Sequence, residues 1–304
     1  MAIFQFLLTS VMPVAAALIL GLFMGRRQVF VMSDAITLSR LIAFVGVPAI
    51  TINIFTTVDL QRIDWMLFAL YASSEAAIYA MGACAARFLF RMNWIESIIV
   101  GMACSFSNHV LFVYPIALLS MPVSQVIPVE ATIIWGVVSL SISITLIELC
   151  TPGRSLPQAA VAQLRNPAMI GCVVGFVLGQ SFETVPAVIT NMAGFFTKMA
   201  APCALFATGL ILSQNLRLHN LSLALTITAY KSVFHPALAF IIIMFWGGYN
   251  LEEGRSTLMV SFAPLGVMAV TFGMRYGVDT GPICLAMLIS FMVALLGIPI
   301  VATW

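Results

Sequence analysis

The chain has 304 residues, of which 62% are hydrophobic and 8% are charged, and its formal net charge is +2 with a mean hydropathy of +1.10. This composition is too apolar for a soluble domain and predicts an all-α polytopic membrane protein. The small net charge gives no indication of a nucleic-acid partner. The six cysteines are scattered singly, without the spacing of a metal site or disulfide framework, so we expect no metal and no cofactor.

Windows of about 20 residues, the length that crosses a bilayer, predict ten transmembrane helices. The first begins without a basic leader and is longer than a signal-peptide core, so we expect it to remain in the mature protein. No loop between the helices is long enough to form a separate domain. The expected ranges are 3–24, 35–56, 65–90, 95–121, 128–149, 167–182, 187–213, 220–246, 254–276 and 280–302.

Basic residues are concentrated in alternate loops. Two arginines, Arg62 and Arg255, lie in one set of loops, and eight lie in the other: Arg26, Arg27, Arg87, Arg91, Arg154, Arg165, Arg217 and Arg275. Cytoplasmic loops of membrane proteins are enriched in Lys and Arg. We therefore expect a multi-pass protein of the cell membrane (inner or plasma membrane), with the basic loops in the cytoplasm and both termini outside.

Prolines recur in the two halves of the chain. Four of them occupy places that we interpret as corresponding: Pro48 with Pro202, and Pro115 with Pro264. Because each half has five spans, the second half enters the membrane with the opposite orientation. We predict two inverted five-helix repeats, residues 1–149 and 167–304, joined by a cytoplasmic linker at 150–166, and this symmetry lets the fourth and ninth spans cross.

The fourth and ninth spans are both interrupted. Polar residues Ser105, Ser107, Asn108 and His109 lie at the centre of the fourth, and Pro264 breaks the ninth. Broken helices are tolerated in hydrocarbon only where the freed backbone groups face protein or a water-filled cavity, and they form the substrate sites of many transporters. Helix N-termini suit an anionic group, and an asparagine offers a donor and an acceptor without the cost of charge.

The predicted substrate-binding residues are therefore Ser107, Asn108 and His109, together with Pro115 and Pro264 at the expected crossing. Two interpretations of His109 stay open: a group that titrates near neutral pH, or a neutral ring bonded to a carbonyl of the opposing helix. Asn53, which follows Pro48 in the second span, is a further candidate to line a cavity; alternatively it is an interhelical hydrogen-bond partner.

Two charged residues lie near the middle of predicted spans, Glu75 in the third and Lys231 in the eighth. A charge at the bilayer centre costs roughly 2.5 to 3.5 kcal/mol, so both are expected to face inward and to lie near each other or a wet cavity. They either exchange protons or replace a coupling ion, or they form a buried pair that fixes packing. His235, one turn after Lys231, either satisfies backbone groups freed by Pro236 or binds substrate.

Several stretches resemble the auxin efflux carrier family of permeases, whose bacterial members include malonate and malate transporters. They are LSRLIAFVGVPAITINIF at 38–55, SFSNHVLFVYPIAL at 105–118, RNPAMIGCVVGFVLG at 165–179, APCALFATGLIL at 201–212 and APLGVMAVTFGMRYG at 263–277. The resemblance implies ten helices in inverted repeats, scaffold and transport domains, and a homodimer. It also implies a ligand contact from Asn108, a supporting role for Glu75, and crossing prolines at Pro115 and Pro264. His109 stands where the family usually has threonine.

These features favour a secondary transporter that moves a small organic anion, a mono- or dicarboxylate, by alternating access, with protons, sodium or no ion as its coupling partner. A channel for small anions stays open as an alternative. An intramembrane hydrolase using Ser107 or Cys104 with His109 is a further alternative, but no acidic residue is placed to orient the histidine and no nucleophile-elbow motif is present. We therefore do not expect an enzyme.

Overall fold

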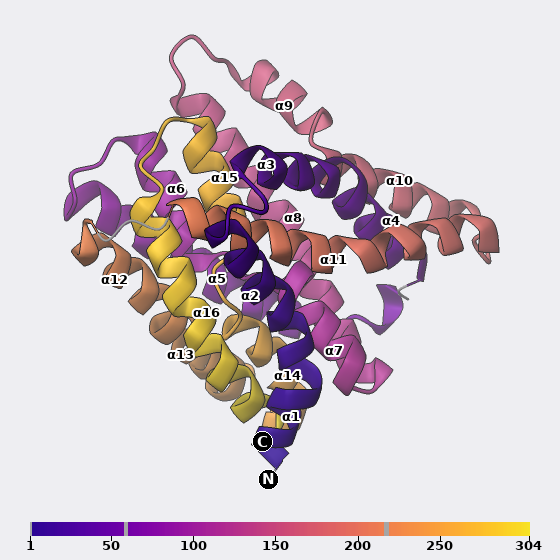
Figure 1. Cartoon of the computed structure of the whole chain (residues 1–304). Helices are drawn as coiled ribbons and strands as arrows, with labels where there is room; N and C mark the ends of the chain where they lie inside the picture. Colours follow the sequence, from indigo (N-terminus) through magenta and orange to yellow (C-terminus); the bar gives the residue numbers. More distant parts are fainter. Residues whose placement is uncertain (1, 58–59, 216–218) are drawn as a thin grey trace. The chain divides into compact units, whose positions relative to one another are not determined.

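The computed structural model describes residues 2–57, 60–215 and 219–304, and the regular structure of these residues is helical, without a named strand (Figure 1). Arg217, one of the predicted loop arginines, lies outside the described residues. The helices in chain order, where η marks a π-helix or a 3₁₀-helix, are α1 (Ala2–Phe6), η1 (Leu7–Val11), α2 (Met12–Arg26), α3 (Met32–Leu41), η2 (Ile42–Gly46), α4 (Val47–Thr57), η3 (Leu60–Arg62), α5 (Trp65–Phe88), α6 (Trp94–Ser105), η4 (His109–Val113), α7 (Tyr114–Ser120), α8 (Val123–Cys150), α9 (Leu156–Leu164), α10 (Pro167–Ser181), α11 (Ala187–Asn215), α12 (Leu221–Ala229), η5 (Tyr230–Phe234), α13 (His235–Phe240), η6 (Ile241–Trp246), α14 (Leu251–Ser261), α15 (Met268–Arg275) and α16 (Gly281–Ala302).

Within the described ranges, seven continuous helical stretches are long and apolar enough to cross a membrane: Ile3–Arg26, Met32–Thr57, Trp65–Phe88, Val123–Cys150, Ala187–Asn215, Leu221–Trp246 and Gly281–Ala302. Three shorter apolar helices accompany them, Trp94–Ser105, His109–Ser120 and Pro167–Ser181. The polytopic all-α class is confirmed. The count of ten crossings and the inverted-repeat relationship stay predictions.

Prolines explain where several of these helices widen. Four five-residue π-helical stretches each end two residues before a proline: η1 before Pro13, η2 before Pro48, η4 before Pro115 and η5 before Pro236. Proline lacks an N–H donor, and its ring clashes with the carbonyl four residues earlier in an α-helix. A wider turn just before the ring relieves that clash. The helices therefore continue through these prolines instead of breaking at them.

The chain forms two compact units, and each draws on both halves of the sequence. The first comprises the described residues of 1–13, 64–139 and 215–304, and the second those of 14–63 and 140–214. All the predicted site residues except Asn53 belong to the first unit. Part of the predicted linker is helical, because α9 occupies Leu156–Leu164.

Within the second unit, glycines let α10 pack closely on α4. A β-carbon added at Gly171 would lie 2.7 Å from Pro48 Cα, and one at Gly175 would lie 2.8 Å from Ile52 Cα. Both distances are too short for a real contact. Small residues at four-residue spacing bring membrane helices together in this way, so these glycines set the distance between the two helices.

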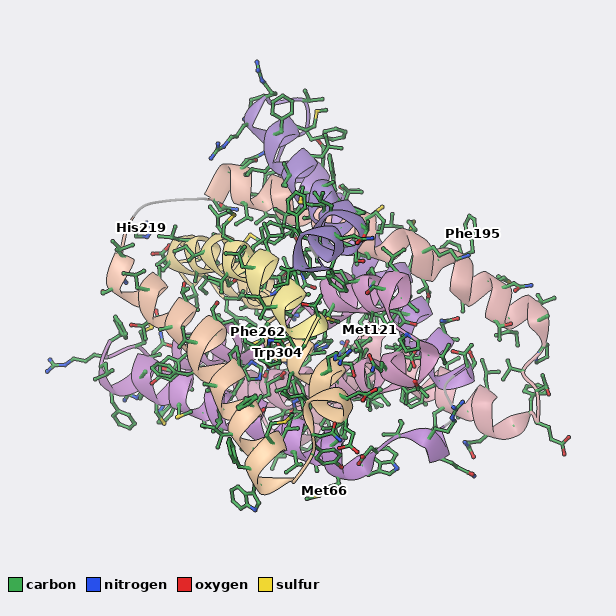
Figure 2. All side chains as sticks on the ribbon, turned by 90° about the horizontal axis from the view of Figure 1, so that it is seen from below. Met66, Met121, Phe195, His219, Phe262 and Trp304 are labelled. Carbon is green, nitrogen blue, oxygen red and sulfur yellow. The ribbon has the colours of Figure 1, made fainter. Side chains whose placement is uncertain are left out.

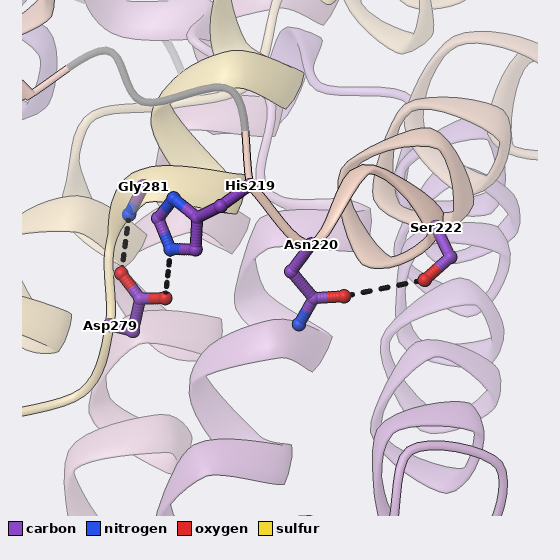
Figure 3. Close-up of polar contacts among 5 residues, drawn as sticks. All are labelled: His219, Asn220, Ser222, Asp279 and Gly281. Atoms are coloured by element: carbon purple, nitrogen blue, oxygen red, sulfur yellow. Dashed lines mark hydrogen bonds and ion pairs between the residues drawn. The ribbon is translucent and has the colours of Figure 1, made fainter.

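Within the first unit, polar contacts fix the starts of α12 and α16 (Figure 3). Asp279 contacts the His219 ring and accepts a hydrogen bond from the Gly281 amide at 3.1 Å. Asn220 accepts a bond from the Ser222 hydroxyl at 3.3 Å. Asp279 thus holds the loop before α16 to the residue that leads into α12.

Large apolar side chains also cover the outer surface of the helices. Phe195 on α11 is 73% exposed and projects away from its helix (Figure 2). Such exposure is costly in water but expected of a lipid-facing surface. It agrees with the membrane class indicated by composition.

Candidate functional site

The breaks in the predicted fourth and ninth spans pair with each other. Between α6 and η4 the helix is interrupted at residues 106–108, with extended backbone at Phe106, and between α14 and α15 the chain passes through Pro264, Leu265 and Gly266. The Asn108 amide donates to the Pro264 carbonyl at 2.9 Å, and the Gly266 amide donates to the Phe106 carbonyl at 3.0 Å. These bonds flank an antiparallel bridge between Ser107 and Leu265, so the freed backbone groups satisfy each other.

Similar caps begin the two helices that lead into this crossing. Asn93 and Glu96 form a capping box at the start of α6, and Asn250 and Glu253 form one at the start of α14. Each box satisfies amide groups that the first helical turn leaves free. Each capping asparagine lies 14 residues before the paired segment, counted to Ser107 in one case and to Pro264 in the other.

The two prolines that we interpreted as corresponding lie at different distances from the crossing. Pro264 lies within the break, whereas Pro115 lies in the first turn of α7, after the wide turns of η4. By spacing from the capping boxes Ser107 corresponds to Pro264, whereas the predicted correspondence of Pro115 with Pro264 as repeat positions stays a prediction. The prolines differ because a wide turn lets a helix contain Pro115 without breaking.

Four helix ends meet at the crossing. Helices α6 and α14 end there with their carbonyl groups, and η4 and α15 begin there with amide groups that have no intrahelical acceptor. The beginning of a helix carries partial positive charge and its end partial negative charge. Helix α16 also stabilises the backbone of the crossing, because the Leu265 amide donates to Ser290 Oγ on α16 at 3.0 Å.

Lys231 is fully buried, with 0% of its surface exposed, and its ammonium group lies beside the crossing. Lys231 Nζ donates to Ser107 Oγ at 3.0 Å and to the Ser261 carbonyl, at the end of α14, at 2.9 Å. It also lies 3.2 Å from His235 Nδ1. These three partners match the three donors of an ammonium group.

Glu75 is 1% exposed and joins the same network through hydroxyl groups. The Tyr71 hydroxyl donates to Glu75 Oε2 at 2.8 Å and lies 3.4 Å from Ser107 Oγ. Trp135 and Ser139 on α8 lie near the carboxylate, but Glu75 Oε1 and Trp135 Nε1 have no hydrogen-bond partner elsewhere in the described structure. The carboxylate and the Lys231 ammonium are near each other, as expected, but Tyr71 and Ser107 lie between them.

His235 has a different partner from the one expected. Its Nδ1 faces the Lys231 ammonium and must accept, which places the ring proton on Nε2, and Nε2 has no hydrogen-bond partner among the described residues. The wide turns of η5 already accommodate Pro236. The histidine therefore does not satisfy freed backbone groups; instead it completes the coordination of the lysine.

Asn108 and His109 lie where η4 begins. Asn108 is buried, and its side chain makes no cap bond to the helix. The His109 ring lies against Gly136 of α8, where a β-carbon would collide with it, and its Nδ1 has no partner in the described part of the chain. One interpretation of His109 is a ring bonded to a carbonyl of the opposing helix. Nδ1 makes no such bond, so this atom remains available to bind a substrate.

The structure also shows which candidates do not meet. Ser107 Oγ accepts from Lys231 and lies near Tyr71, and no hydrogen bond joins it to His109 in the portion of the chain that the structure describes. Asn53 is half-buried on α4 in the second unit. Sequence reasoning missed Tyr71 and Ser290. Tyr71 had a signal, because it shares a helix face with Glu75 four residues later, whereas nothing in the sequence linked Ser290 to a backbone amide of Leu265.

Comparisons with known proteins indicate transport. Residues 151–302, half of the chain, match a family model described as "Membrane transport protein". The chain is also 24% identical over 255 residues to a protein of Rhizobium meliloti (strain 1021) named "Putative malonate transporter", and this similarity covers 79% of the chain and 78% of the relative. Both similarities point to a membrane transporter and not to an enzyme.

Proposed function

The chain belongs to the auxin efflux carrier family of membrane transport proteins, and on this premise we propose that it is a secondary transporter that moves a small organic anion, a mono- or dicarboxylate, by alternating access. The substrate site that we propose is the crossing of the two broken helices. A membrane transporter of this family binds a small molecule and lies in the lipid bilayer.

The observation that carries the proposal is the pair of helix beginnings at the crossing. The first amides of η4 and α15, which have no acceptor within their own helices, provide partial positive charge for a carboxylate. Asn108, at the first of these helix ends, has a side-chain amide that its own helix does not use. A neutral amide binds a carboxylate without trapping it, which suits a site that must also release its substrate.

Lys231 contributes a fixed positive charge. The three donors of its ammonium group are held by Ser107, His235 and the Ser261 carbonyl, so the charge stays in place. A dissolved cation, by contrast, would have to bind with each substrate. It also lies at the negative end of α14, where a cation is stabilised. We propose that Lys231 replaces a bound coupling ion beside the site, and that Glu75 and Tyr71 balance its charge and hold Ser107.

Ser107 connects this charge to the substrate. Its oxygen accepts a bond from Lys231, and its own proton can turn from the Tyr71 oxygen, 3.4 Å away, to a bound carboxylate. A hydroxyl polarised by an ammonium is a stronger donor to a carboxylate. In this proposal Ser107 and Asn108 contact the anion, His109 presents its free ring nitrogen at the same helix end, and Pro264 keeps the ninth span open.

Alternating access needs two bodies that move against each other. The first compact unit contains the whole crossing network, so we propose it as the transport domain and the second unit as the scaffold. Asn53 in the second unit is then a candidate to line the path. The matching capping boxes support the proposal of ten crossings in inverted repeats, 1–149 and 167–304, joined by 150–166. Both termini are proposed to lie outside the cell membrane, with homodimerisation through the scaffolds.

Malonate is the first anion to test, because the relative from Rhizobium meliloti carries that name. Purified protein in liposomes should take up labelled malonate, or another mono- or dicarboxylate, with saturable kinetics, and internal unlabelled substrate should accelerate entry by exchange. A bound anion should also raise the thermal unfolding temperature. Flux that rises linearly with concentration and shows no exchange would indicate a channel and refute alternating access.

A further inference from the structure

A second buried carboxylate lies outside the crossing network. Glu130 on α8 is 8% exposed, and its Oε1 accepts a hydrogen bond from the Tyr114 hydroxyl on α7 at 3.1 Å. Tyr114 immediately follows η4, the helical stretch that begins at Asn108. The contact therefore ties the second half of the broken fourth span to the neighbouring helix α8.

The environment of Glu130 differs from that of Glu75. Glu75 receives a phenol hydrogen bond and, in addition, the field of the nearby Lys231 ammonium, which joins it through Tyr71 and Ser107. Glu130 has its phenol partner, but no lysine, arginine or histidine forms an ion pair with it among the residues that the structure describes. A buried carboxylate without a cation is costly to keep charged.

Other titratable groups contact α8 at different places. The His109 ring of η4 lies against Gly136, and Glu75 of α5 interacts with Trp135 and Ser139. At 3.6 residues per turn, Trp135 and Ser139 point roughly 140° to 180° away from Glu130 around the helix axis. Glu130 and Glu75 thus occupy opposite sides of α8, and Tyr114 is the titratable group bonded to Glu130.

We propose that Glu130 is a proton-binding residue of the transport cycle, with Tyr114 as its hydrogen-bond partner. A proton from the aqueous phase forms an O–H bond on the Glu130 carboxylate. The neutral acid then donates a hydrogen bond to the Tyr114 oxygen, whereas the carboxylate had accepted one from the Tyr114 hydroxyl. Release of the proton restores the original bond. Because Tyr114 belongs to the broken span, this reversal couples proton occupancy to the helix that begins at the substrate site. The inference rests on the proposed transport function and adds a proton as the coupling ion, whereas the fixed charge of Lys231 stands in for a bound metal cation.

The test compares two modes of transport in liposomes with labelled malonate, or with whichever carboxylate the wild type exchanges. Exchange of internal for external anion needs no net proton movement, whereas accumulation driven by an imposed pH gradient does. We expect Glu130→Gln to lower gradient-driven accumulation about tenfold while changing exchange less than about twofold. We expect Glu75→Gln, which alters the crossing network, to lower both modes together.

Two further variants keep the inference testable if Glu130→Gln does not fold. Glu130→Asp should retain gradient-driven accumulation, because it keeps the proton acceptor. Tyr114→Phe should retain exchange but shift the pH at which driven uptake is half-maximal. A wild-type protein that exchanges anion but ignores the pH gradient would overturn the proton site alone. So would driven accumulation in Glu130→Gln equal to wild type, or an unshifted pH profile in Tyr114→Phe. Absence of wild-type exchange with every carboxylate would instead overturn the transport function.

Discussion

Lys231 Nζ donates a 3.0 Å hydrogen bond to Ser107 Oγ, although the two residues are 124 positions apart in the chain. One belongs to the π-helical η5, and the other to the extended segment between α6 and η4. The bond places a fully buried ammonium group against the backbone of the helix crossing. A charge that is costly in hydrocarbon is thereby turned into a fixed feature of the proposed anion site.

Replacement of this lysine should damage both folding and transport. Lys231→Met removes a cation and leaves Ser107, His235 and the Ser261 carbonyl without their donor, and it leaves Glu75 without a nearby positive charge. Breaking such a buried arrangement costs about 3 to 5 kcal/mol. We expect a lower unfolding temperature in detergent and no carboxylate uptake.

A second lysine provides the control for that substitution. Lys198 lies in the membrane-length helix α11 and is exposed. Lys198→Met should leave the unfolding temperature and the uptake rate close to wild type. Equal damage by the two substitutions would show that loss of a membrane lysine, and not loss of the crossing network, is responsible.

Asn108 should be needed for transport but not for folding. Its side chain makes no cap bond, so Asn108→Ala removes no hydrogen bond to its own helix, but it deletes the amide proposed to hold the carboxylate. We expect uptake to fall at least about a hundredfold, with an unfolding temperature near that of wild type and no stabilisation by added anion. Asn191→Ala, at an exposed position of α11, is the matched control. Wild-type uptake by Asn108→Ala would remove this residue from the site.

Ser290 should stabilise the backbone of the crossing from the neighbouring helix α16. It accepts from the Leu265 amide at 3.0 Å and donates to the Met287 carbonyl, so Ser290→Ala leaves a buried amide unsatisfied at a cost of about 1 to 3 kcal/mol. We expect a reduced unfolding temperature and weaker apparent affinity for the anion. Ser120→Ala, which removes only a bond to the carbonyl of Ile116 in an exposed turn, should change neither. An unchanged affinity in Ser290→Ala would show that the crossing does not depend on this contact.

The sequence predicted the helices well, because lipid restricts what can cross it. Membrane-length apolar runs and the two polar or proline interruptions follow from the cost of exposed backbone in hydrocarbon. The inward position of Glu75 and Lys231 follows from the same cost applied to charge. Both breaks were therefore located to within a few residues, as the ends of α6 and α14 show.

Contacts that depend on side-chain direction were harder to predict. Pro115 lies in α7, beyond the paired segment, whereas Pro264 lies within it; a proline can break a helix or follow a wide turn, and composition does not distinguish the two. The link from Glu75 through Tyr71 and Ser107 to Lys231 joins three separate segments. Periodicity indicates which face a residue occupies, but not which hydroxyl of another helix lies opposite it.

Close packing in the second unit can be tested with a pair of glycines. A methyl group at Gly175 would lie 2.8 Å from Ile52 Cα, and backbone cannot move aside as a flexible side chain can. A methyl group at Gly194 would meet only Asn53 Oδ1, at 3.8 Å, which is an ordinary contact. Gly175→Ala should therefore destabilise the protein by about 1 to 3 kcal/mol through overpacking.

Gly194→Ala should be neutral or stabilise by up to about 1 kcal/mol, because alanine loses less backbone entropy than glycine on entering a helix. Unfolding temperatures in detergent would measure the difference, since both glycines lie in helices of the same compact unit. If the two substitutions had the same effect, α4 and α10 would not approach as closely as their backbone positions indicate. A large loss confined to Gly175→Ala would show instead that the absence of a side chain on α10 determines the packing of this unit.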